Sequence, residues 1–257
     1  MTAPNAAPRS GRCTLVGAGP GDPELLTLKA LKAIQAATLL LVDDLVSEAI
    51  VALAPAGARI EHVGKRGGCK STPQADIEAR MVAAVRAGET VVRLKGGDPF
   101  IFGRGGEEVQ HLRAAGIDVQ VVNGITAGLA GMTLLGAPLT HRRHAHGVVF
   151  ITGHSQPGGA GTDWRQLAAT ARDARLTLVI YMGVAGCARI QQELLTALPA
   201  HMPAAVIQHV SLPQQRHVVT TLGELQDAIA RERLASPSVI VIGDVVRGIA
   251  AAGSALA

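Results

Sequence analysis

A buried strand that runs directly into a glycine-rich loop is the feature that most constrains this chain. Val91 to Lys95 reads as a short apolar strand after a turn at Gly88. The loop that follows, Gly96 to Gly106, holds five glycines and two of the chain's three phenylalanines. Glycine lets backbone approach a ligand without a Cβ in the way, so the pattern favours a binding loop at a strand end. The alternative is a glycine-rich surface loop with solvated charges.

The first half of the chain repeats the order strand, loop, helix. This repetition predicts a parallel sheet with right-handed crossovers. A helix is expected after the first strand, with Leu25, Leu28, Leu31 and Ile34 spaced along one face. Either Asp22 with Pro23 or Thr27 could cap it. The other expected elements are strands at Cys13 to Val16, Thr38 to Val42 and Val119 to Val122, and helices from Ser71–Gln74 to about Ala87 and from Glu107 to Ala115.

The loop after the first strand, Gly17-Ala18-Gly19-Pro20-Gly21-Asp22-Pro23, resembles a dinucleotide-binding turn. Asp43 lies about 20 residues further on, where such turns have a ribose-binding acid. The third glycine is missing, however, and Asp22 places a negative charge where a pyrophosphate would bind. A nicotinamide-dependent oxidoreductase is therefore kept only as an alternative.

Three more loops carry candidate site residues. Asp43 and Asp44 end the second strand, at the sheet edge where ligands gather in α/β proteins, although they could equally cap the next helix. The segment from Gly64 to Lys70 places Lys65 and Arg66 among glycines, which suits either a flap over acidic groups or an ordinary basic loop. Small residues from Asn123 to Gly128 follow another strand and leave backbone groups open to a ligand.

The second half has a different pattern. A polar, basic stretch from Pro138 to His146 is the candidate junction, so the expected organisation is a flexible tail at residues 1–11, an N-terminal α/β domain at 12–137 and a C-terminal α/β domain at 138–257. The late strands are closely spaced and β-branched, which predicts a mixed second sheet. They are Gly147 to Thr152, Thr177 to Met182, Ala204 to Val210, His217 to Thr221 and Ser238 to Val246.

Composition excludes several classes of protein. The 257 residues are 48% hydrophobic, enough for a sizeable core, but only 2% aromatic, which disfavours a nucleic-acid reader. The net charge of +4 suits a small polyanionic substrate better than a nucleic acid. Cys13, Cys69 and Cys187 have no metal-ligand spacing, so neither a disulfide framework nor a metal site is expected, and a reducing cytoplasm is the expected compartment. No signal peptide or membrane span is visible.

Taken together, the motifs closely resemble the uroporphyrinogen III C-methyltransferases, a branch of the tetrapyrrole methylase family that uses S-adenosylmethionine. They follow the family's order over nearly the whole chain after the tail. The matching pieces are Gly17-Ala18-Gly19-Pro20-Gly21-Asp22, Asp43 with Leu45-Val46-Ser47, Gly64-Lys65-Arg66, Arg93 to Glu108, Gly124-Ile125-Thr126-Ala127, Pro138-Leu139-Thr140-His141-Arg142, Thr152-Gly153-His154, Tyr181-Met182-Gly183 and Gln215-Arg216.

The resemblance implies two α/β domains with the cofactor in the cleft between them, and a homodimer. It implies S-adenosylmethionine as cofactor, S-adenosylhomocysteine as product, a tetrapyrrole as substrate and no metal. Catalytic roles would fall on Asp43, Lys65, Arg104 and Glu107. Cofactor contacts would fall on Pro20, Gly96, Gly97, Asp98, Ile101, Thr126, Ala127, Met182 and Val210. Substrate contacts would fall on Lys65, Arg66, Arg104, Arg142, His154 and Met182.

The reaction implied is two successive methylations of uroporphyrinogen III, at C2 and C7, to give precorrin-2. The runner-up is methylation of a later corrin intermediate. The sequence leaves open whether the product enters siroheme, cobalamin or heme d1 synthesis. This sequence departs from the family at Val42 (usually tyrosine), at Asn123 (commonly proline) and at His209-Val210 (usually Asn and a small residue). The last of these changes bears on the cofactor contact at Val210, where a contact through the backbone would survive it.

Overall fold

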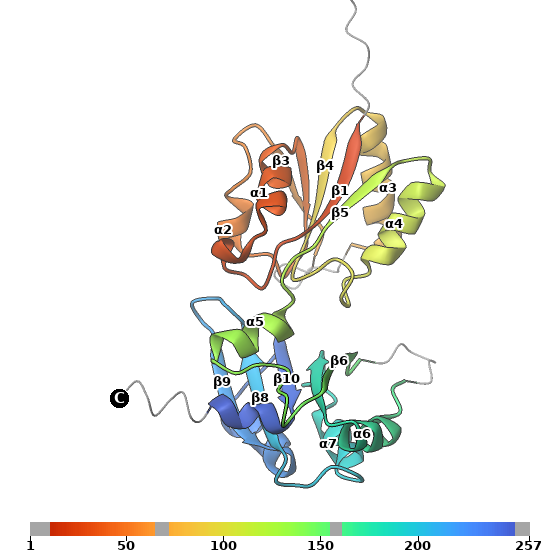
Figure 1. Ribbon diagram of the computed structural model, residues 1–257. Coiled ribbons are helices and arrows are strands. Elements are labelled where there is room, and N and C mark those ends of the chain that lie inside the picture. The colour runs from red at the N-terminus through yellow and green to blue at the C-terminus, as the bar shows by residue number, and fades with distance from the viewer. Residues whose placement is uncertain (1–10, 65–71, 155–160, 250–257) are drawn as a thin grey trace, which may run out of the picture. The chain divides into compact units, whose positions relative to one another are not determined.

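The computed structural model describes residues 11–64, 72–154 and 161–249, and its contacts divide the chain into two compact units, Met1–Thr126 and Ala127–Ala257 (Figure 1). The division lies earlier than the boundary expected after residue 137. The reason is the helix α5 (Ala127–Leu134), which packs on strands β7 (Leu176–Tyr181) and β10 (Ser238–Ile242) of the second unit. All but residue 11 of the predicted tail lies outside the described residues.

The first unit is built on five parallel strands, as the repeated pattern predicts. They lie in the order β3-β2-β4-β1-β5. Their bounds are β1 (Arg12–Gly17), β2 (Leu39–Val42), β3 (Arg59–His62), β4 (Thr90–Lys95) and β5 (Val119–Val122). Because Gly17 pairs with Lys95 and Val16 with Val122, the loops after β1, β4 and β5 leave from one edge of the sheet. That edge carries the candidate site.

Helices cover both faces of this sheet (Figure 1). On one face, α1 (Leu28–Gln35) and α2 (Glu48–Val51) bury Ile34 and Ile50 against the strands. On the other, α3 (Gln74–Arg86) and α4 (Gly105–Ala114) bury Met81 and Leu112. Each face therefore has its own apolar core, and both predicted helices, near residues 74–87 and 107–115, are present.

The start of α1 uses both of the predicted caps. Asp22 accepts the amide hydrogen of Glu24 at 2.8 Å and caps a short 3₁₀ turn, Pro23–Leu25, whereas Thr27 caps α1 itself through the amide of Ala30 at 3.1 Å. Two elements thus occupy the stretch that was expected to form one helix. The prediction that Leu28 shares the buried face is wrong, because this first residue of α1 is 77% exposed.

The second unit contains the predicted mixed sheet, in the order β6-β7-β10-β8-β9. Strands β6 (Gly147–Thr152) and β7 run parallel, whereas β10 is antiparallel to both β7 and β8 (Pro203–Gln208). Strand β9 (Arg216–Thr221) pairs antiparallel with β8. Strand β10 ends at Ile242, before the predicted Val246, because Gly243 turns the chain into a 3₁₀ turn at Asp244–Val246.

Helices α6 (Trp164–Asp173), α7 (Cys187–Leu194) and α8 (Leu225–Arg231) form a core with alternate residues of the second sheet, among them Leu178 and Ile240. Helix α5 lies against other residues of the same strands. A Cβ added at Gly128 would meet Val179, and one added at Gly131 would meet Ile207. Small residues on α5 therefore allow close packing on the sheet. Among the described residues, no helix is both long and apolar enough to cross a membrane.

Two cysteine thiols lie in these cores and should be unreactive. Burial raises the pKa of Cys13 in β1 to about 12 and that of Cys187 in α7 to about 11. Because the thiolate is the reactive form, neither residue should be modified in the native protein at neutral pH. We expect a Cys69→Ser variant to take up no thiol reagent until denaturant is added, and then to take up two equivalents. Rapid modification in native buffer would contradict this packing.

Candidate active site

Three glycines bring three loops of the first unit together, backbone against backbone. A Cβ added at Gly17 would lie 2.5 Å from the amide nitrogen of Gly124 and 2.7 Å from the carbonyl oxygen of Gly97. Paired hydrogen bonds between Gly19 and Gly97, 2.7 and 3.1 Å long, link the loops after β1 and β4. Gly97 has φ +66°, a conformation that favours glycine. The glycines therefore fix the geometry of this sheet edge.

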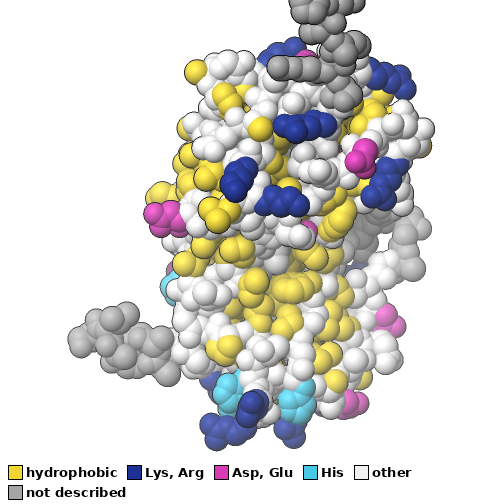
Figure 2. All heavy atoms as spheres, turned by 45° about the horizontal axis from the view of Figure 1, so that its top comes forward, with side chains coloured by type: hydrophobic (Ala, Val, Ile, Leu, Met, Phe, Trp, Pro, Cys, Tyr) yellow, Lys and Arg dark blue, Asp and Glu magenta, His cyan; other side chains and the backbone are white. Residues whose placement is uncertain are grey.

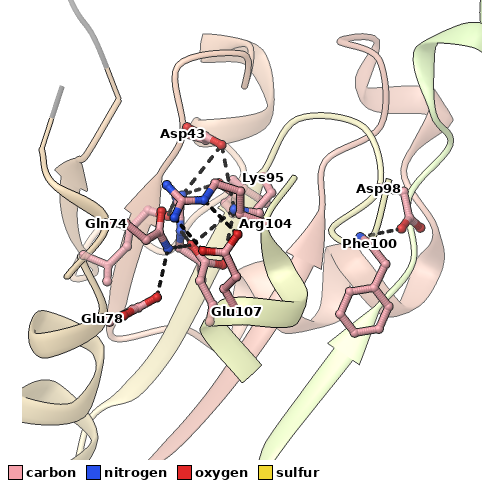
Figure 3. A network of polar contacts seen from close by, with 12 residues as sticks. Asp43, Gln74, Glu78, Lys95, Asp98, Phe100, Arg104 and Glu107 are labelled. Atoms are coloured by element: carbon pink, nitrogen blue, oxygen red, sulfur yellow. Dashed lines mark hydrogen bonds and ion pairs between the residues drawn. The ribbon is translucent and has the colours of Figure 1, made fainter. Parts of the chain in front are cut away.

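Asp98 connects the loop after β4 to the loop after β5. Its carboxylate accepts hydrogen bonds from the amides of Phe100 (2.8 Å) and Gly124 (3.2 Å), and from Nδ2 of Asn123 (3.1 Å). Asp98 is 8% exposed, and Figure 3 shows it beside Phe100. Both carboxylate oxygens thus bind the protein itself, so this side chain orients the loop. Asn123, a departure from the family pattern, supplies one of the three donors.

The structure brings together the six predicted cofactor contacts of the first unit. Pro20 directly follows Gly19, which is hydrogen-bonded to Gly97. The amide of Ile101 donates to the carbonyl oxygen of Asp98 at 3.2 Å, and a Cβ added at Gly97 would lie 3.8 Å from Cα of Thr126. This edge offers backbone groups and small side chains, which fit a polar, uncharged part of a ligand.

Arg104 and Glu107 form a two-pronged ion pair at the start of α4. Nε and Nη2 of Arg104 donate to the two oxygens of Glu107 at 3.0 and 2.5 Å. The hydrogen bond from Arg104 lowers the pKa of the Glu107 carboxyl, and the same bond raises the pKa of the guanidinium. Both side chains are about half exposed and line a cavity of about 470 Å³. The cavity is also lined by Phe100, Gly105 and Gly106.

The backbone of this loop is strained at two positions without a glycine. Phe102 has φ +53° and Arg104 has φ +57°, the left-handed region that costs a side chain energy. In the second unit, Met182 after β7 (φ +53°) shares this conformation, as do His209 and Ser211 after β8. Such strain is common at ligand-binding sites, although Arg175 and Arg233, which follow helices α6 and α8, have the same conformation away from these loops.

A buried charged cluster lies beneath the loops, and Asp43 is its one member to which the sequence assigned a role. It consists of Arg93 and Lys95 on β4, Glu108 on α4, and the partly exposed Asp43 after β2. Glu108 accepts a hydrogen bond from Nε of Arg93 at 3.0 Å, and Nζ of Lys95 lies 3.2 Å from each of its oxygens. Gln74 also donates to Glu108, at 3.1 Å. Arg93 and Lys95 are two residues apart on one strand, so their side chains lie on the same face of the sheet. This spacing is the sequence signal that could have revealed the cluster.

The second unit gathers its three predicted cofactor contacts around α5. Ala127 is the first residue of this helix, and the next amide, of Gly128, donates to the hydroxyl of Tyr181 at 2.8 Å. Met182 follows Tyr181 and is 49% exposed. Val210 is 5% exposed, and its side chain lies against Gly131 of α5. A ligand contact at Val210 would therefore involve its backbone.

The predicted substrate contacts of the second unit do not all lie together. His154 follows β6, and the neighbouring Gly153 packs against Gly183, so His154 lies close to Met182 in the chain's fold. Arg142 lies in an exposed turn before β6, at the opposite end of that strand. A six-residue strand spans about 20 Å, which separates Arg142 from His154.

Lys65 and Arg66, with the rest of the predicted flap, lie outside the described residues. Within residues 11–64, 72–154 and 161–249, no three or more His, Cys, Asp or Glu side chains are grouped so that they could hold a metal ion.

Residues 12–226 match the family model for tetrapyrrole (corrin/porphyrin) methylases. The chain therefore belongs to the tetrapyrrole methylase family, and the two α/β units with a parallel and a mixed sheet are the architecture of that family. It is 51% identical over 241 residues to a uroporphyrinogen-III C-methyltransferase of Pseudomonas aeruginosa, covering 93% of this chain and 96% of the relative. It is 47% identical to a siroheme synthase of Azotobacter vinelandii, covering 94% of this chain but only 52% of that protein.

A solved structure of uroporphyrin-III C-methyltransferase from Thermus thermophilus, complexed with S-adenosyl homocysteine, is also similar to this chain. The TM-score is 0.77 at 42% identity, and the match covers 92% of this chain and 99% of the other. A protein with the same fold as this chain thus binds S-adenosyl homocysteine.

Proposed function

We infer that this chain is an S-adenosylmethionine-dependent C-methyltransferase that converts uroporphyrinogen III to precorrin-2 by methylating C2 and then C7. The observation that carries the inference is the match to the Pseudomonas aeruginosa enzyme along nearly the whole length of both chains. A relative solved with S-adenosyl homocysteine supports the choice of cofactor.

We propose that the cofactor is held by backbone and small residues at strand ends. In the first unit the proposed contacts are Pro20, Gly96, Gly97, Asp98, Ile101 and Thr126. In the second they are Ala127, Met182 and Val210. Since both oxygens of Asp98 already accept hydrogen bonds from the protein, its proposed role is to hold the loop in place and to offer its remaining lone pairs to a ligand hydroxyl.

The substrate carries eight carboxylates, which require cations. Arg104 is the proposed anchor for one carboxylate arm, because a guanidinium binds a carboxylate through two parallel hydrogen bonds. The cavity beside it combines this donor with the ring of Phe100, which suits a pyrrole bearing an acidic arm. Lys65, Arg66 and His154 are further proposed contacts, whereas Arg142, at the opposite end of β6 from His154, is no longer one of them.

The sulfonium of the cofactor supplies an electrophilic methyl group, so the protein needs no nucleophile of its own. Its residues must position the attacking ring carbon and accept the proton that the resulting cationic ring loses. Asp43 and Glu107 are the proposed acceptors, since both are carboxylates at the sheet edge (Figure 3). Lys65, which matches a position with an acid-base role in the family, is proposed to assist this proton transfer.

We also propose a homodimer in a reducing cytoplasm, on the family resemblance and on the cysteine usage. Nucleic acid is not a proposed partner. On the face drawn in Figure 2, Lys and Arg side chains stand in several separate places among hydrophobic and uncharged ones, without the single stripe typical of such binding.

The test is incubation with cofactor labelled in its methyl group and enzymatically generated uroporphyrinogen III. We expect two labelled methyl groups per product molecule. One labelled methyl group on a later corrin substrate, and none on uroporphyrinogen III, would favour the runner-up. In a thermal unfolding assay S-adenosylmethionine should raise the melting temperature and NADH should not, because only a ligand of the native state stabilises it. The opposite result would favour an oxidoreductase.

A further inference from the structure

The buried cluster beneath the loops has an unbalanced charge of its own. The side chains of Arg93 and Lys95 are each 3% exposed and that of Glu108 is 0% exposed. Two cations thus face one buried carboxylate. An uncompensated buried charge is costly, so a further negative group is needed nearby.

Asp43 supplies the missing negative charge. Its Oδ2 lies 3.7 Å from Nη2 of Arg93 and 4.0 Å from Nζ of Lys95, at distances where charge acts without a direct hydrogen bond. Its Oδ1 accepts the amide hydrogen of Asp44 at 3.0 Å. With a side chain 34% exposed, Asp43 is the one member of the cluster that a ligand could readily reach (Figure 3).

We propose that Arg93, Lys95 and Glu108 are positioning residues that hold the Asp43 side chain at the sheet edge and set the charge around it. The proposal rests on the proposed function, in which Asp43 accepts a proton from the methylated ring. The two buried cations lie next to the group that takes this proton, so a change in the charge of the cluster should alter the pH dependence of turnover.

Lys95 is the most informative member of the cluster. The charged groups that face it are Arg93 on its own strand, Glu108 and Glu107 on α4, and Asp43 after β2. Burial lowers its pKa, and the charge of Arg93 lowers it further, whereas Glu108 and Asp43 act in the opposite direction. The positive charge of Lys95 is therefore stabilised by both carboxylates, so Asp43 interacts electrostatically with the buried part of the cluster.

The test changes the net charge of the cluster by mutation. For each variant, turnover of uroporphyrinogen III is measured over the acidic part of the pH range. Lys95→Met leaves one negative charge too many, so the fall in turnover on acidification should begin about one pH unit higher than in the wild type. The double variant Lys95→Met/Glu108→Gln restores the balance, and its profile should return to that of the wild type. Thermal unfolding of each variant controls for folding.

A purely structural role predicts a different pattern. Lys95→Met and Glu108→Gln would then each lose turnover at every pH, and the double variant would lose more. The pH at which turnover falls on acidification would not change in any of them, and this result would overturn the proposal. If Lys95→Met does not fold, Glu108→Gln carries the test. It adds net positive charge, so the fall in its turnover on acidification should move to lower pH, and a move to higher pH would contradict the proposal.

Asp43→Asn separates this proposal from the proposed function. If that variant keeps its turnover, Asp43 is not the proton acceptor, and the role given to the cluster fails with it. A second outcome is that Asp43→Asn loses turnover while the pH at which turnover falls does not change with the net charge of the cluster in the Lys95 and Glu108 variants. In that case only the role of the cluster fails. Transfer of labelled methyl groups by the wild-type protein tests the enzyme activity separately from both.

Discussion

Changing Arg104 to lysine is expected to lower turnover of uroporphyrinogen III about 30-fold. Lysine keeps the positive charge but loses the planar guanidinium, in which Nε and Nη2 donate to Glu107 and the remaining N–H groups are proposed to bind a carboxylate arm. A hydrogen bond to a charged group contributes about 1.5 to 3 kcal/mol, which sets the size of the effect. Steady-state rates at saturating cofactor measure it.

Arg189→Lys is the matched control for this change. Arg189 lies on α7, pairs with Glu193 at 2.9 Å and is similarly exposed, but it has no proposed role in the reaction. We expect its variant to turn over substrate at the wild-type rate. An Arg104→Lys variant as active as this control would refute the assignment of Arg104 as an anchor.

Changing Gly124 to alanine should be the most damaging small substitution at the contact between the three glycine loops. Its new Cβ would collide with the carbonyl oxygen of Gly97 and with Gly17, and neither backbone can move without disturbing its strand. Overpacking of this kind costs about 3 kcal/mol. We expect a lower free energy of unfolding in urea, together with loss of cofactor binding in calorimetry.

Gly57→Ala provides the comparison, because an added Cβ there meets nothing within 4 Å. It should change the free energy of unfolding by less than about 0.5 kcal/mol. If the Gly124 and Gly57 variants were equally stable and bound the cofactor equally well, the three-loop contact would not be what fixes the site.

Sequence pattern predicted the strands well where their residues are apolar. The runs at Val91 and Val119 lie in buried strands, and the change from a parallel to a mixed sheet was correctly expected. Strand β3 went unpredicted because Arg59-Ile60-Glu61-His62 is a polar edge strand without a buried face. Strand order within each sheet depends on tertiary packing and has no local signal.

The site was predicted less completely than the fold. Family motifs identified Arg104, Glu107 and the glycine loop, and the structure places these residues together. They gave no role to Glu108, because a glutamate in the first turn of a helix is ordinarily solvated, and only the tertiary fold buries it under β4. For Arg142 the motif predicted a substrate contact, but the fold places this residue at the end of β6 opposite His154, and the sequence has no signal for that position.

The position of β10 has a consequence for how the protein is made. This strand joins the pair β6-β7 to the pair β8-β9, yet within the part of the chain that the structure describes it is the last strand to be synthesised. On the ribosome the first sheet can form early, whereas the second remains as two separate halves with exposed edges until Ser238–Ile242 has emerged. Premature termination before Ser238 would therefore leave a chain prone to aggregation.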